Sequence, residues 1–162
     1  HLSGHLFNQF GIYPRQLSEL TGVLFWVLLH ADFAHLLLNT APLVVMGFFV
    51  ALRGPRLFLK ITVVVWVVAG IAVWLFGRSA FHIGASGLVF GYFGFLLAVA
   101  VVERNITDLT IASFTVFYYG GMIFGVLPVD AFVSWESHLF GLASGVLAAR
   151  LFGRDWVLAQ EA

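Results

Sequence analysis

The 162-residue chain contains no cysteine and few charged side chains. The absence of cysteine excludes structural disulfides, thiolate metal sites and a cysteine nucleophile. Charged residues make up 10% of the sequence, against roughly 25% in an ordinary soluble domain. The eight basic and eight acidic residues cancel, so net charge gives no attraction to nucleic acid. The alternation of apolar and polar residues typical of membrane β-barrel strands is also absent.

Apolar residues dominate the chain: 61% of it is hydrophobic and its mean hydropathy is +1.00. A soluble core of this length could not hide so much apolar surface, which indicates a polytopic membrane protein. Five stretches approach the roughly 20 residues that a helix needs to cross a bilayer, namely Phe33–Leu52, Leu57–Phe76, Gly84–Val102, Leu109–Leu127 and Trp135–Phe152. The sequence therefore predicts an all-α transmembrane helical bundle with five complete spans.

The connections between these stretches are short and rich in turn residues, and the chain has no internal repeat or linker. We therefore expect residues 1–162 to form a single membrane domain. Residues 1–13 are interpreted as the tail of a further helix, 14–31 as an outer loop, 32–152 as the five spans and 153–162 as a cytoplasmic tail. The apolar segment around Trp26 is too short to cross, so we expect that loop to dip into the outer leaflet with an interfacial tryptophan.

The distribution of basic residues predicts the orientation. Six of the eight lie near one set of turns and the carboxyl end, namely Arg53, Arg56, Lys60, Arg104, Arg150 and Arg154, and only Arg15 and Arg78 lie on the other side. The side with more basic residues is expected in the cytoplasm. The stretches that begin near His35, Ser86 and His138 then all start at the outer face of the membrane.

Ser86 and His138 each open a predicted span, and Ser86 follows Gly84 and Ala85. A hydroxyl and an imidazole at one level of the membrane are typical of a nucleophile and its general base in acyl transfer. The alternative for Ser86 is a helix N-cap, which a serine before an apolar run usually provides. The alternative for His138 is a polar residue at the interface. Because an ionisable residue in a span is costly, the functional interpretation is favoured for His138.

Glycine spacing predicts how these two helices meet. Gly87 and Gly91 are four residues apart, as are Gly141 and Gly145, and this spacing lets helix backbones approach closely. His138 precedes the second pair by three and seven residues, so all three share one helix face. Packing of the two glycine faces would bring the imidazole within hydrogen-bond reach of the serine.

Near the start of the first span, His35 and Asn39 are four residues apart and share a helix face. Both could donate hydrogen bonds to a developing oxyanion, and the alternative is interhelical hydrogen bonding. His30 and His35 are five apart, which is poor geometry for two ligands of one metal, so no metal site is predicted. His30 is expected to anchor the preceding loop by hydrogen bonds.

Phe90 lies one turn after the serine and could present its ring to His138, although core packing accounts for it equally well. His82 lies in the loop before the serine, and the sequence indicates no role for it. The acidic residues near span ends and turns are interpreted as solvated charges, and none is placed to orient His138: Asp32, Asp108 and Asp130. The expected arrangement is thus a Ser-His dyad.

The order and spacing of these residues resemble those of the rhomboid intramembrane serine proteases. The resemblance extends from about Gly11 to Leu151 and rests on the segments His30–Asn39, Gly84–Gly87 and His138–Gly145. It implies a six-helix core of the bacterial type, of which this chain holds five helices and a remnant of the first. It also implies a serine-type endopeptidase of the plasma membrane that uses no cofactor. Such an enzyme cleaves transmembrane protein substrates near the outer face of the bilayer.

The resemblance also implies a role for each matching residue. Ser86 is similar to the nucleophile and His138 to the general base, while His35, Asn39 and the Ser86 backbone N–H resemble the oxyanion hole. The residues similar to supporting positions of the family are His30, Gly84, Gly87, Phe90, Gly141 and Gly145. Many members have tyrosine where Phe90 stands, and the glutamate common near the end of the second family helix is absent from Gly47–Leu52.

Two other functions stay open. A catalytically silent relative would bind and escort membrane proteins, but such relatives generally lose the serine or the histidine, and both are present here. A channel or transporter would need a polar path or paired charges at mid-membrane, and the second and fourth predicted spans offer only Lys60 near one end. The sequence indicates no oligomeric state.

Overall fold

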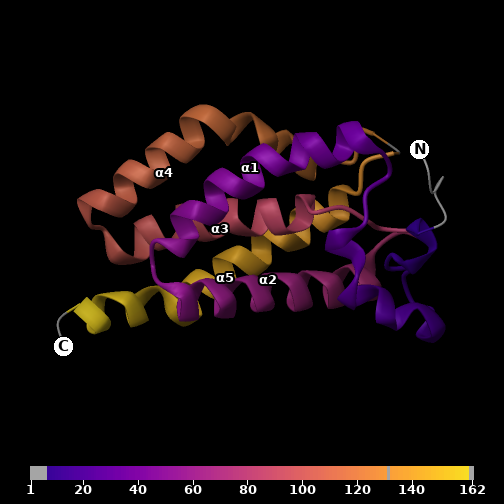
Figure 1. Cartoon of the computed structure of the whole chain (residues 1–162), viewed down its shortest axis with the longest axis horizontal. Helices are drawn as coiled ribbons and strands as arrows, with labels where there is room; N and C mark the ends of the chain where they lie inside the picture. Colours follow the sequence, from indigo (N-terminus) through magenta and orange to yellow (C-terminus); the bar gives the residue numbers. More distant parts are fainter. Residues whose placement is uncertain (1–6, 131, 161–162) are drawn as a thin grey trace.

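A computed structural model describes residues 7–130 and 132–160, with side chains as far as residue 153. Within these residues the chain forms α1 Phe33–Ala51, α2 Pro55–Phe76, α3 Ser86–Glu103, α4 Ile106–Tyr119 and α5 Trp135–Gln160. The helices run back and forth along one long axis, so that α1, α3 and α5 begin at the same end of the bundle (Figure 1). The predicted all-α fold is confirmed, and the end at which these three helices begin is called the site end below.

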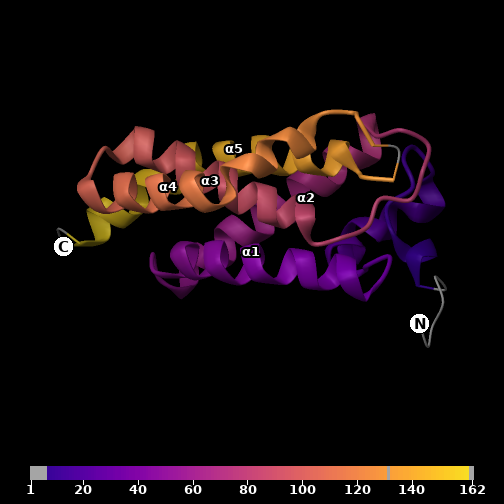
Figure 2. The same ribbon diagram turned by 90° about the horizontal axis from the view of Figure 1, so that it is seen from above.

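In the part of the chain that the structure describes, four helices are long and apolar enough to cross a membrane: α1, α2, α3, and α4 together with its 3-10 continuation η4, Gly120–Val126. The protein is therefore an integral membrane protein. The fifth predicted span, α5, is not among these four by composition, but it runs alongside α3 and α2 (Figures 1 and 2). It begins at Trp135 as expected and continues beyond Phe152, so residues 153–160 of the predicted tail are helical.

Helix α3 occupies the centre of the bundle. Within its most apolar window 72% of the residues are buried, against 28% or less for each of the other three candidate spans. Helices α1 and α5 lie on opposite sides of it (Figure 2). The helix begins at Ser86 and not at Gly84 as predicted, because Gly84 has a φ of +118°, which is not helical. Ser86 is thus held at the start of the most enclosed helix.

The α3–α5 contact forms where the glycine spacing predicts it. A Cβ atom on Gly141 would overlap the carbonyl oxygen of Gly87, and one on Gly145 would overlap that of Gly91. The missing side chains therefore let the two backbones touch. The two α3 glycines also face other elements: a Cβ atom on Gly87 would overlap Trp26, and one on Gly91 would overlap Val65. Helix α3 is thus closely packed on both sides.

Trp26 is fully buried, which contradicts its predicted interfacial position. It lies in the short 3-10 helix Trp26–Leu28, one of two such turns in the loop before α1, the other being Leu17–Leu24. The absence of side chains at Gly70 and Gly87 leaves room for its indole between α2 and α3. The apolar face of this loop packs on the helices because two glycines from other elements make a space that fits it.

The amino-terminal segment differs from the predicted helix tail. Residues 1–6 of that prediction lie outside the described residues, and Asn8–Phe10 form only a 3-10 turn. The chain is then extended, and Ile12 pairs with His82 in an antiparallel bridge with N–O distances of 3.1 and 2.9 Å. Gly11 packs closely here: a Cβ atom on it would overlap the Ile83 side chain and the His82 carbonyl oxygen, and one on Gly22 would overlap the Gly11 carbonyl oxygen.

A buried ionic cluster lies at the opposite end of the bundle. The Arg53 guanidinium donates to Glu103 at 2.8 Å and to Asp108, and all three side chains are at most 4% exposed. The Asn105 amide also donates to Asp108, at 2.6 Å. The cluster joins the ends of α1, α3 and α4, so the interpretation of Asp108 as a solvated turn charge is wrong. Its partner Arg53 lies 55 residues away, which no local pattern reveals.

Candidate active site

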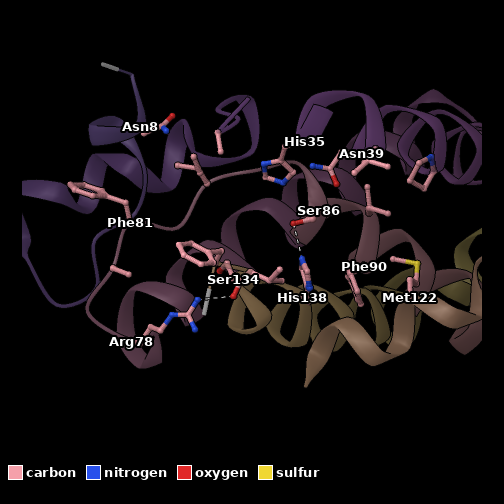
Figure 3. A pocket seen from close by; sticks show the side chains of 18 of the residues that line it. Asn8, His35, Asn39, Arg78, Phe81, Ser86, Phe90, Met122, Ser134 and His138 are labelled. Carbon is pink, nitrogen blue, oxygen red and sulfur yellow. Dashed lines mark hydrogen bonds between the residues drawn. The ribbon is translucent and has the colours of Figure 1, made fainter. Parts of the chain in front are cut away.

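The site end brings Ser86 and His138 together. The Ser86 hydroxyl donates to His138 Nε2 at 2.9 Å, which confirms the predicted approach of the two side chains (Figure 3). The N-cap of α3 is Ala85, and Ser86 is the first helical residue. The N-cap alternative for this serine is therefore wrong, because its hydroxyl bonds to an imidazole of α5 and not to its own helix.

Two further contacts fix the His138 ring, one at its Nδ1 edge and one on its face. His138 Nδ1 lies 2.8 Å from the Gly125 carbonyl oxygen, which can only accept, so Nδ1 carries the hydrogen. This tautomer leaves Nε2 as the acceptor for Ser86. The Phe90 ring stacks on the imidazole with centroids 4.2 Å apart and planes 7° apart, so of the two alternatives for Phe90 the ring contact is present. The dyad histidine is thus fixed in both tautomer and plane.

Gly125 also belongs to the candidate site, although no motif in the sequence indicates it. A Cβ atom there would lie 3.0 Å from Phe90 Cζ and 3.1 Å from His138 Nδ1. Glycine therefore allows the backbone carbonyl to approach the imidazole edge closely. The available signal was a glycine inside an apolar run, but that pattern does not reveal which ring the carbonyl meets.

Helix α1 brings two further polar side chains to the other side of Ser86 (Figure 3). Asn39 is buried, and its Nδ2 has no hydrogen-bond partner within the described part of the chain. An unpaired buried donor is uncommon in folded proteins and is available to a ligand. The His35 ring lies beside Gly84, where an added Cβ would be 2.9 Å from His35 Cε1 and 3.7 Å from Ser86 Oγ. The position that a side chain at residue 84 would take is therefore bordered by the imidazole and the serine oxygen, and glycine leaves it unfilled.

The loop before α3 is anchored through its backbone N–H groups. Gly84 takes up its positive φ while its N–H donates to the Trp26 carbonyl at 2.8 Å. The Ala85 N–H donates to His30 Nε2 at 3.4 Å, so this bond joins His30 to the loop before α3, whereas the prediction was an anchor for the loop that precedes His30. Burial lowers the pKa of His30, and the neighbouring His35 lowers it further, which favours the neutral acceptor form. The N–H of Ser86, in the first turn of α3, has no acceptor within its own helix.

A cavity of about 620 Å³ opens above the dyad. Its lining includes the predicted residues Ser86, His138, His35 and Asn39. Further polar residues of the lining are Asn8, Arg78 and Ser134, and its larger apolar and aromatic side chains include Leu38, Pro42, Phe81, Phe90, Met122 and Phe132. Within the described ranges, no group of three His, Asp or Glu residues is arranged to bind a metal. The cavity presents a hydroxyl, an imidazole and hydrogen-bond donors to an apolar ligand.

Comparison with protein families identifies the family to which the chain belongs. The model of the rhomboid domain matches residues 17–155, which include α1 to α4, most of α5 and every predicted site residue. The chain belongs to the rhomboid family. Uncharacterized proteins of Mycobacterium tuberculosis and Mycobacterium leprae are 41% and 42% identical to it over 159 residues. These alignments cover 93% of the chain but 66% and 63% of the relatives, so the chain spans just under two thirds of their length. No solved structure gives a significant match.

The rhomboid chain departs from the common family pattern at two places, one in the site and one near the opposite end of α1. Phe90 keeps an aromatic ring on the histidine where many rhomboids have tyrosine. The segment Gly47–Leu52 lacks the usual glutamate, and Gly47 instead lies beside the Tyr92 ring. The Tyr92 hydroxyl shares a hydrogen bond of 2.7 Å with Thr62 of α2. In this chain the buried hydroxyl of Tyr92 on α3 is therefore paired with Thr62 of α2.

Proposed function

We propose that this rhomboid is a serine endopeptidase that cleaves transmembrane protein substrates through the Ser86–His138 dyad. The observation that carries the proposal is the Ser86–His138 hydrogen bond at 2.9 Å, with Nδ1 fixed by the Gly125 carbonyl. A structural serine would not need a base whose tautomer is set from the opposite edge.

The reaction follows from the positions of these groups. Ser86 Oγ attacks a substrate carbonyl carbon while its proton passes to His138 Nε2. The resulting oxyanion forms in the space beside Gly84, where the Asn39 amide, the His35 ring and the Ser86 N–H are its donors. Collapse of this intermediate breaks the C–N bond, and Nε2 returns the proton to the leaving amine. Water then cleaves the acyl-serine ester by the same two proton transfers in reverse.

The surroundings of the dyad support a membrane-embedded substrate. The cavity above it is mainly apolar and lies between α1 and η4. A peptide bond inside a helix is shielded by its own hydrogen bonds, so the substrate segment must unwind before it can be attacked. The distribution of basic residues supports an extracytoplasmic site in the plasma membrane.

The test is labelling with a serine-directed fluorophosphonate probe in detergent, together with cleavage of a model transmembrane substrate. We expect the protein to be labelled and to cleave, and we expect Ser86→Ala and His138→Ala to lose both activities while they keep their melting temperature. Ser144→Ala is the matched control, because this buried serine donates only to Phe140 O of its own helix. Cleavage by Ser86→Ala would refute the assignment. A folded parent that neither labels nor cleaves would favour the escort function.

A further inference from the structure

A second polar cluster lies beside the dyad and is centred on His82, in the loop between α2 and α3; its Ser134 is half-buried and lines the cavity. His82 is 1% exposed. Its Nδ1 lies 2.5 Å from Ser134 Oγ, and that oxygen lies 2.6 Å from Ser137 Oγ. Its Nε2 lies 3.0 Å from the Arg78 carbonyl oxygen. Neither ring nitrogen contacts the dyad, so the reaction proposed above does not use this histidine.

The hydrogen-bond directions in this cluster are determined by its acceptors. The Arg78 carbonyl can only accept, so His82 Nε2 carries the hydrogen and Nδ1 accepts from the Ser134 hydroxyl. The Ser134 oxygen then accepts from Ser137. This pattern requires a neutral imidazole, and burial lowers the pKa of His82, which favours that form. The three side chains therefore make one directed chain of hydrogen bonds.

The chain of hydrogen bonds connects the two segments that carry the dyad. His82 lies four residues before Ser86, and Ser137 directly precedes His138. Arg78 reinforces the connection, because its N–H donates to Glu136 at 3.2 Å and its guanidinium donates to the Val133 carbonyl at 2.6 Å. The loop before α3 is thus fastened to the start of α5 by several bonds outside the helices.

We propose that His82 is a positioning residue of the active site, which sets the separation of Ser86 from His138 through its bonds to Ser134 and Ser137. This inference rests on the proposed protease function and deepens it. The glycine contacts between α3 and α5 determine how closely the helices approach, and the His82 bonds add a link from the loop before α3 to the start of α5. A misplacement of about 1 Å between nucleophile and base can cost roughly 10²-fold in rate.

The kinetic test compares His82→Ala, Ser134→Ala and the double variant. We expect each single change to lower kcat by about 10- to 10²-fold with a much smaller change in KM. Because the two residues act as one link, the double variant should lose no more than the worse single variant. His82→Asn should recover much of kcat, since its amide oxygen can replace Nδ1 as the acceptor. Ser144→Ala again controls for the loss of a buried serine in α5.

A second measurement does not depend on activity. Hydrogen exchange in His82→Ala and in Ser134→Ala should rise in both residues 80–86 and residues 134–139, and Ser144→Ala should raise neither. If the parent neither labels nor cleaves, the protease proposal fails, and exchange still decides whether the link exists. Faster exchange in only the mutated segment would overturn the inference. Unchanged kcat in His82→Ala, or additive losses in the double variant, would also overturn it.

Discussion

Replacing Gly84 by alanine tests the proposed oxyanion space most directly. The new Cβ would lie 2.9 Å from His35 Cε1, whereas ordinary contact begins near 3.4 Å, so the imidazole must move by about 0.5 Å. The methyl group would also stand 3.7 Å from Ser86 Oγ, where a tetrahedral oxygen needs room. We expect kcat to fall by about 10²–10³-fold, the loss typical of one missing oxyanion donor.

Backbone strain at Gly84 needs its own control, because its φ of +118° disfavours any side chain. Gly54 provides this control, since it has a φ of +95° and an added Cβ there would meet nothing within 4 Å. Both alanine variants should lose about 1–3 kcal/mol of stability from strain. Only Gly84→Ala should lose turnover per folded molecule.

The assay is cleavage of a model transmembrane substrate in detergent, with kcat and KM measured separately and folded protein counted by thermal unfolding. If Gly84→Ala turns over within a few-fold of Gly54→Ala, no oxyanion forms beside residue 84 and the proposed site geometry is wrong. If Gly54→Ala loses turnover equally, backbone strain explains the effect at both positions.

Two further predictions concern Asn39 and the buried cluster at the other end of the bundle. Asn39→Ala should lower kcat by about 10²–10³-fold and change KM less, because the unpaired amide is used only when an oxyanion forms. A change in KM alone would make Asn39 a substrate-positioning residue. Asp108→Ala should destabilise the fold by about 3–5 kcal/mol, since it removes one partner of the buried Arg53, while turnover per folded molecule stays constant. Asp130→Ala, a change at an exposed carboxylate, is the control in denaturant unfolding, and equal stability of the two variants would refute the role of the cluster.

The helices and much of the site could be predicted from the sequence because the information there is local. Apolar runs of bilayer length must be helical, since lipid offers backbone groups no other hydrogen-bond partner. The four-residue spacing of His35 and Asn39 places them on one face of α1 whatever surrounds it. The glycines at 141 and 145 permit a backbone contact that no larger residue would allow. Motif order and helix direction then bring the serine and the histidine to the same end.

The remaining features depend on how the helices rotate and shift relative to one another, which no local pattern specifies. Trp26 is buried because glycines on α2 and α3 happen to face the same space. Gly125 orients His138 only because η4 passes the edge of that imidazole. His82 acquires partners 52 residues away because its loop folds over the start of α5. The sequence by itself determined which segments are helical and which polar residues share a face, whereas tertiary packing decided which buried groups meet, because a hydrogen bond requires a particular separation across elements distant in the chain.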